Sequence, residues 1–389
     1  MHSETMIPNA YLILDDGSTW PGRYFGASPP SAGKLAESNA VFDGEVIFNT
    51  GMTGYHEILT DPSYTGQIVL MTYPHIGNYG DDDSWSEIGP ETGRSTLPGI
   101  KARGLVVRSV HDGPVPAGRI RLHDFLEKNG VCGISEVDTR GLTLKLRTEG
   151  SRNGVIVAVG RNGVLSDESK KAAMEHIGKM PSMAGADLTG EVGTAEVETF
   201  NPEGAPHVAL LDCGLKMNIV RELISRGCKV TVLPSGSDAA GVRGAGPDAL
   251  LFSNGPGDPE PLEAQAALAG ELLGELPLWG ICLGHQVLAR AVGGKTYKMS
   301  FGHHGVNHPV RDEKTGRVFV TSQNHGFAVD ETTLPAGYSV RFRNANDGTV
   351  EGLENTSVKL ICVQHHPEAS PGPVDSSWIF DTFLSTLED

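Results

Sequence analysis

The chain has 389 residues, a length that indicates two or three domains with substantial hydrophobic cores. Its formal net charge of −17 argues against nucleic acid or another polyanion as a partner. The sequence contains no apolar window of transmembrane length and no export signal, so we expect no membrane contact and a cytoplasmic location. The five cysteines, an odd number, favour reduced thiols over a disulfide framework.

The N-terminal part alternates short apolar runs with glycine-rich turns from Ala10 to about Val159. Long helical periodicities are few there, so residues 1–160 are predicted to form a β-rich α/β domain. Residues 161–205 turn small and polar, which is typical of a connector. The acidic run Asp81-Asp82-Asp83 is expected to be a solvated loop.

Residues 206–389 open with an alternation of strand and helix signals. An apolar run at 207–212 precedes a helical stretch at about 216–226 and a second apolar run at 229–233. This β-α-β opening predicts a mostly parallel sheet flanked by helices. Lys216, at the start of the helical stretch, is expected to be a solvated or interface cation rather than a catalytic group.

A cysteine lies between two glycines in the segment 280–286, Gly-Ile-Cys-Leu-Gly-His-Gln. An apolar strand ends just before Cys282 and a helix is predicted from about Gly284, so the thiol lies on a tight strand-to-helix turn that presents it as a nucleophile. The N-terminal dipole of this helix would favour the thiolate. The alternative is that Cys282 is simply a small buried apolar residue.

A candidate base and its orienting partner lie near the C-terminus. The apolar run 360–363 is predicted to be a buried strand, and it opens into Gln-His-His-Pro-Glu at 364–368. Residues two apart on an extended segment point the same way, so Glu368 could reach His366 and fix its tautomer. With Cys282, these residues supply a nucleophile, a base and an orienting group at the ends of strands of one sheet.

Three ordered motifs resemble the signatures of class I, triad-type glutamine amidotransferases: 254–259 (Asn-Gly-Pro-Gly-Asp-Pro), 280–286 and 366–368 (His-Pro-Glu). The resemblance implies that Cys282 is the nucleophile, His366 the general base and acid, and Glu368 the residue that orients His366. It also implies an oxyanion hole made by the backbone N–H groups of Gly257 and Leu283. The implied reaction is hydrolysis of glutamine to glutamate and ammonia through a glutamyl thioester.

The segments 44–64, 73–80 and 137–140 extend the likeness, because they resemble the small subunit of carbamoyl-phosphate synthetase. The resemblance implies that the chain is one subunit of a heterodimeric ligase of pyrimidine and arginine biosynthesis. The correspondence implies a glutamine pocket with Ser63 contributed by the first domain. Its expected members are Ser63, Gly255, Gly257, Leu283, Gln286, Asn324, Gly326 and Phe327.

No P-loop, dinucleotide fingerprint or ATP-using module is recognisable, so we expect no cofactor in this chain. No metal site is expected either, because the spacing of His303, His304 and His308 matches no standard zinc pattern. The resemblance implies a large partner subunit that binds ATP and Mg and uses the ammonia to make carbamoyl phosphate from bicarbonate. A free-standing cysteine hydrolase of γ-glutamyl compounds and a non-catalytic scaffold subunit remain as alternatives.

Overall fold

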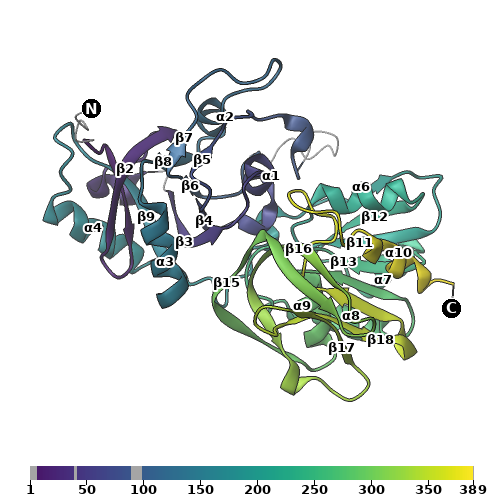
Figure 1. Ribbon diagram of the computed structural model, residues 1–389. Coiled ribbons are helices and arrows are strands. Elements are labelled where there is room, and N and C mark those ends of the chain that lie inside the picture. The colour runs from purple at the N-terminus through teal and green to yellow at the C-terminus, as the bar shows by residue number, and fades with distance from the viewer. Residues whose placement is uncertain (1–6, 39–41, 89–98, 389) are drawn as a thin grey trace. The chain divides into compact units, whose positions relative to one another are not determined.

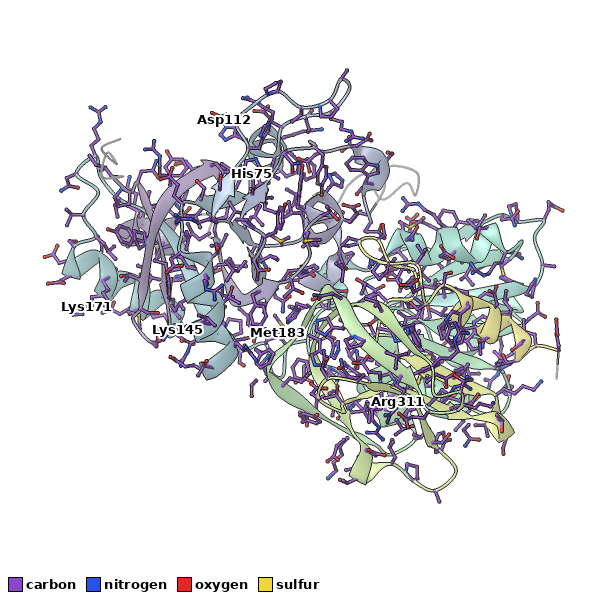
Figure 2. All side chains as sticks on the ribbon, in the orientation of Figure 1. His75, Asp112, Lys145, Lys171, Met183 and Arg311 are labelled. Atoms are coloured by element: carbon purple, nitrogen blue, oxygen red, sulfur yellow. The ribbon has the colours of Figure 1, made fainter. Side chains whose placement is uncertain are left out.

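The computed structural model describes residues 7–38, 42–88 and 99–388, which form two compact units (Figure 1). The first unit is the described part of Met1–Thr60, Gly66–Ser86 and Pro98–Met183. The second is the described part of Asp61–Thr65, Glu87–Leu97 and Ala184–Asp389. Met183, labelled in Figure 2, is therefore the last residue of the first unit. None of the helices described is long and apolar enough to cross a membrane.

These limits differ from the domain boundaries expected from the sequence. The expected connector, 161–205, is divided between the units and contains helix α4 (Asp167–Ile177), helix α5 (Thr189–Val192) and strand β10 (Glu198–Phe200). Helix α4 belongs to the first unit because Ala173 and Ile177 are buried against that unit's strands. Composition did not reveal this helix, because its buried stripe is narrow and its remaining positions are polar.

The first unit is built on a closed barrel with the strand order β1-β2-β8-β6-β4-β3-β9. Apolar side chains from its strands fill the interior, including the fully buried Leu12, Ile68, Ile134 and Ile156. Closure leaves the barrel no open sheet edge that could pair with another chain. The elements are β1 (Ala10–Leu14), β2 (Thr19–Gly26), β3 (Phe42–Asn49), β4 (Gln67–Met71), β5 (His75–Ile76), β6 (Gly104–Val106), β7 (Ser109–Val110), β8 (Cys132–Ser135), β9 (Arg152–Ala158), α1 (Tyr55–Thr60), α2 (Leu122–Lys128), α3 (Thr139–Glu149) and α4.

The acidic run at 81–83 is not simply a solvated loop, and the expectation is wrong for Asp81. Its carboxylate is buried and accepts a hydrogen bond from His56 Nδ1 at 3.0 Å. Burial raises the pKa of Asp81, and the contact with His56 offsets part of that shift. The partner lies on α1, 25 residues earlier in the chain, so the run of acidic residues alone did not reveal it.

The second unit contains a ten-stranded sheet with the order β10-β12-β11-β13-β14-β19-β18-β17-β15-β16. Strands β12, β11, β13, β14 and β19 run parallel, as expected, and antiparallel strands extend the sheet on both sides. The strands not yet bounded are β11 (His207–Asp212), β12 (Lys229–Pro234), β13 (Ala249–Phe252), β14 (Leu278–Ile281), β15 (Lys295–Asp312), β16 (Val318–Asp330), β17 (Ser339–Asn344), β18 (Val350–Asn355) and β19 (Leu360–Val363).

Helices cover both faces of the parallel strands (Figure 1), which confirms the predicted α/β class. Because side chains alternate along a strand, Val208 and Leu210 of β11 pack on one face and Ala209 and Leu211 on the other. The first face packs against α6 (Met217–Ser225) and α10 (Trp378–Ser385). The second packs against α7 (Ala239–Ala245), α8 (Glu263–Leu272) and α9 (Leu283–Ala291).

Phe383 on α10 offers a test of this packing. Its ring is fully buried and stacks on Trp279 of β14, with ring centroids 5.4 Å apart. Because Phe383→Ala leaves a cavity against the sheet, we expect it to lower the free energy of unfolding by about 3–5 kcal/mol in urea titrations. Val374→Ala is the control, since Val374 is 69% exposed and its truncation should cost less than about 0.5 kcal/mol. Equal effects of the two substitutions would contradict the packing described.

Candidate active site

Cys282 occupies the turn between strand β14 and helix α9. Its backbone has φ 54° and ψ −105°, a conformation that a non-glycine residue adopts only when its surroundings enforce it. A Cβ atom on Gly284 would overlap the carbonyl oxygen of Phe252, and one on Gly280 would lie 2.7 Å from the Gly284 carbonyl. Both glycines are therefore required by close packing, and together they hold the cysteine at the start of the helix.

Polar groups from β16 and from the end of β19 surround the sulfur. Cys282 Sγ lies 3.6 Å from the carbonyl oxygen of Asn324, to which a thiol can donate, and Gln364 Nε2 donates to the sulfur at 3.7 Å. Gln286 Nε2 in turn donates to Gln364 Oε1 at 2.9 Å and to the Phe327 carbonyl at 2.8 Å. The sequence motifs do not single out Gln364, although it stands two residues before His366 on the same extended segment.

His366 and Glu368 form a buried pair. His366 Nδ1 donates to Glu368 Oε1 at 2.6 Å, and both side chains are at most 1% exposed. Burial opposes a charged ring, but the Glu368 carboxylate and Cys282 outweigh it and raise the pKa of His366 to about 10. The other ring nitrogen, Nε2, is buried and has no hydrogen-bond partner within the described chain. The ring is therefore held protonated, with one nitrogen available to the reacting groups.

Lys216 contacts this pair and is not the solvated or interface cation expected from the sequence. Its Nζ lies 3.0 Å from Glu368 Oε1, the side chain is 1% exposed, and it also donates to the carbonyl of Ala369. Burial disfavours a charged amine, but Glu368, Glu87 and Asp61 hold the pKa of Lys216 above its ordinary value. In return, Lys216 and His366 overcome the effect of burial and lower the pKa of Glu368 to about 2. The prediction failed because the partner carboxylate lies far along the sequence.

The loop 254–259 follows β13 and packs closely against its neighbours. A Cβ atom on Gly255 would overlap the carbonyl oxygen of Cys213, and Gly257 has φ 93°. Asn254 accepts a hydrogen bond from the Lys216 backbone N–H at 2.9 Å and donates to Ser63 Oγ at 2.9 Å. The segment that contains Ser63 is therefore part of the second unit, although the sequence places it within the expected first domain.

The predicted glutamine pocket thus lies entirely within the second unit. Ser63 is on the 3-10 turn Pro62–Tyr64, Leu283 and Gln286 are on α9, and the remaining members are on the 254–259 loop and on β16. Asn324 combines a fixed acceptor with an open donor: its Oδ1 lies 2.7 Å from His304 Nδ1, whereas its buried Nδ2 has no hydrogen-bond partner within the described chain. An unpaired buried donor of this kind is suited to an anionic group of a ligand.

A second histidine cluster lies on the β15–β16 hairpin. Ligand atoms of His303, His325 and Glu351 lie within 4.8 Å of one another, close enough to consider a metal ion. However, His303 faces Asp347 at 2.8 Å and Glu351 at 3.5 Å, and these carboxylates outweigh burial and raise its pKa to about 9. Both nitrogens of His325 also lie within hydrogen-bond distance of oxygen atoms. These donor atoms already have partners, so the cluster forms a buried network of ion pairs and hydrogen bonds.

Glu368 offers a test of the charge distribution at the site. Replacing it with Gln removes the carboxylate that raises the pKa of His366, so that pKa should fall from about 10. We expect a fall of about one unit or more, which an NMR titration of the His366 ring measures. The control is Glu354→Gln, which removes a carboxylate paired with Arg341 on β17 and should leave the pKa of His366 unchanged. An unchanged pKa of His366 in Glu368→Gln would contradict the assignment.

Comparisons with known proteins agree on a single family. Residues 209–386 match the family model described as glutamine amidotransferase class-I, and residues 12–156 match the carbamoyl-phosphate synthase small chain, CPSase domain. The carbamoyl phosphate synthase small chain of Methanopyrus kandleri is 45% identical over 382 residues, covering 98% of this chain and 99% of the relative. The small chain of Yersinia pseudotuberculosis is 43% identical over 404 residues, covering 98% and 96%, and that of Escherichia coli K12 is 42% identical over 405 residues, covering 98% of each. The chain therefore belongs to the carbamoyl-phosphate synthase small chain family.

Proposed function

We propose that this chain hydrolyses glutamine at Cys282, His366 and Glu368 and passes the ammonia to a larger synthetase subunit. The observation that supports it most strongly is the strained Cys282 turn beside a buried histidine whose pKa Glu368 and Cys282 raise. A scaffold subunit would have no use for the strain at Cys282 or for a buried cation beside it. Family membership likewise favours the glutaminase role over a free-standing hydrolase or a scaffold.

In the first half of the reaction, the Cys282 thiolate attacks the carboxamide carbon of glutamine. The backbone N–H groups of Gly257 and Leu283 are proposed to hold the oxyanion that forms. When the C–N bond breaks, His366 gives its proton to the departing nitrogen, which leaves as ammonia. A glutamyl thioester and a neutral His366 remain.

In the second half, His366 removes a proton from a water molecule, which then attacks the thioester carbon. The C–S bond breaks, glutamate is released, and the thiolate and protonated His366 are restored. Glu368 does not take the proton, because Lys216 and His366 keep its pKa near 2, well below that of the ring. Its role is to orient the ring and to stabilise its charge.

The polar groups of the pocket suit an α-amino acid. Asn324 Nδ2, a buried donor, can receive the α-carboxylate of glutamine. Gln286 uses its Nε2 for Phe327 and Gln364, so a contact with the α-ammonium group would fall to its Oε1. Ser63, Gly255, Gly257, Leu283, Gly326 and Phe327 complete the proposed pocket.

The ammonia-consuming step is assigned to another chain. The relatives are named as small chains of carbamoyl phosphate synthase, and this name implies a larger partner chain. The partner is proposed to be an ATP-dependent subunit that makes carbamoyl phosphate from bicarbonate. ATP and Mg would be bound by that subunit, and we propose no cofactor or metal for this chain. The pair would supply carbamoyl phosphate to pyrimidine and arginine biosynthesis in the cytoplasm.

Cys282→Ser tests the nucleophile. A serine hydroxyl is nearly isosteric with the thiol but far less ionised, so glutamine hydrolysis should fall by about 10⁴-fold or more while the fold is retained. Mass spectrometry after incubation with glutamine should find a glutamyl adduct on Cys282 of the parent protein and none in the variant. The matched control is Cys228→Ser, which alters a buried cysteine of the same unit that lies in its hydrophobic core. Substantial glutaminase activity in Cys282→Ser would remove Cys282 as the nucleophile.

The partner proposal predicts that hydrolysis is coupled to synthesis. The glutaminase rate should rise when the chain is in complex with the ATP-dependent subunit and both ATP and bicarbonate are present. We expect an increase of about 5- to 150-fold, which corresponds to a typical coupling free energy between two sites. The measurement compares the isolated chain, the complex, and the complex with both substrates. Equal rates in all three would favour a free-standing hydrolase instead.

A further inference from the structure

Glu87 is a buried carboxylate that the proposed mechanism does not use. It belongs to the second unit, is fully buried, and makes contacts with two other segments. Its Oε1 accepts a hydrogen bond from Ser370 Oγ at 2.6 Å, and its Oε2 accepts one from the Asn218 backbone N–H at 3.1 Å. Its carbonyl oxygen accepts from the Met217 N–H at 2.8 Å. Both carboxylate oxygens therefore act as acceptors.

Two of these contacts cap helix α6 from a distant segment. The residue at the N-cap of α6 is Lys216, whose side chain makes no capping hydrogen bond. The first N–H groups of the helix are instead satisfied by Glu87, and its negative charge lies at the positive end of the helix dipole. Glu87 thus fixes the position of the helix end that carries Lys216.

The loop after Glu368 is strained and is held from the same place. Ala369 and Ser370 have φ of 54° and 53°, in the left-handed region that disfavours side chains. Asn218 Nδ2 donates to the Glu368 carbonyl, Lys216 Nζ donates to the Ala369 carbonyl, and Ser370 Oγ donates to Glu87. A strained loop persists only when its surroundings enforce it, and here those contacts come from Glu87 and the start of α6.

A row of alternating positive and negative side chains begins at His366 and continues through Glu368, Lys216 and Glu87 to Arg221. His366 pairs with Glu368 at 2.6 Å, Glu368 with Lys216 at 3.0 Å, and Glu87 with Arg221 at 3.6 Å. Burial raises the pKa of Glu87 above its ordinary value, and Lys216 offsets part of that shift. Glu87 in turn favours the charged form of Lys216, which links the His366–Glu368–Lys216 part of the row to the Glu87–Arg221 pair. Arg221 has 31% of its side chain exposed, whereas the four residues before it have at most 1%.

We propose that Glu87 is a positioning residue for the triad: it holds Lys216 and the 368–370 loop so that Glu368 stays aligned with His366. It touches neither substrate nor sulfur in the proposed reaction and acts through Lys216 and Ser370. This inference rests on the proposed glutaminase function. The experiment therefore has to distinguish a failure of the positioning role of Glu87 from a failure of the glutaminase function.

The test is Glu87→Gln in the full chain, with glutamine hydrolysis measured from pH 6 to 10.5. The substitution keeps the shape of the side chain but removes its charge, so Lys216 is held less firmly and Glu368 stabilises His366 less. We expect kcat to fall about tenfold or more with KM for glutamine unchanged within about twofold, because the residue makes no substrate contact. The alkaline limb of kcat/KM should move to lower pH by about half a unit to one unit, since His366 must be protonated to release ammonia.

Asp312→Asn is the matched control, because it removes the charge of another buried carboxylate of the second unit, paired with Arg341 at 2.7 Å. It should lower thermal stability while leaving kcat and the alkaline limb unchanged. The proposal is overturned if Glu87→Gln leaves the limb in place, or if both variants lose activity only in proportion to their stability. If Cys282→Ser abolishes hydrolysis and Glu87→Gln has no effect, the proposed function stands and this inference alone fails.

Ser370→Ala keeps the proposal testable if Glu87→Gln does not fold. It deletes a single hydroxyl and leaves no buried charge unpaired, so the fold should be retained. We expect kcat to fall about threefold, with a shift of the alkaline limb in the same direction but smaller than that for Glu87→Gln. A limb identical to that of the parent protein would overturn the role assigned to Glu87.

Discussion

The candidate site depends on one constraint: a carboxylate buried between two cations. Glu368 lies 2.6 Å from His366 and 3.0 Å from Lys216, and all three side chains are at most 1% exposed. Burial would neutralise a lone carboxylate, but two neighbouring cations keep it ionised. The ionised carboxylate in turn keeps His366 protonated beside Cys282. Removal of Glu368 would leave two buried cations without their shared carboxylate, whereas removal of either cation would leave Glu368 with one partner.

The fold class was predictable because it depends on local patterns. Buried strands such as Leu278–Ile281, which follows Pro277, are short apolar runs, and the turn at Cys282 is marked by its two glycines. Cys282 and His366 follow neighbouring parallel strands, so the sheet brings them together, as their positions at strand ends predicted. The strand pairings of the closed barrel were not predictable, since pairing between distant strands leaves little trace in a single sequence.

The residues that sequence analysis missed share one physical character. Lys216, Glu87 and Gln364 are polar side chains whose importance lies in a partner far along the chain, at 152 positions for Lys216 and Glu368 and 82 for Gln364 and Cys282. Nothing local distinguishes a buried lysine from a solvated one at the start of a helix. Burial of the whole neighbourhood has to be known first, and that follows from the tertiary fold.

The assignment of Asp61–Thr65 and Glu87 to the second unit has a consequence for how the protein is made. Both segments leave the ribosome well before Cys282, yet they join a unit whose other residues begin at Ala184. The second unit therefore cannot form its site from contiguous sequence. The segment that contains Ser63 and the residue Glu87 are both separated from Ala184 by more than 90 residues, which are synthesised before the rest of the unit. Contacts between such widely separated segments are slow to form. The chain would accordingly become able to release ammonia only late in folding, after these long-range contacts have formed.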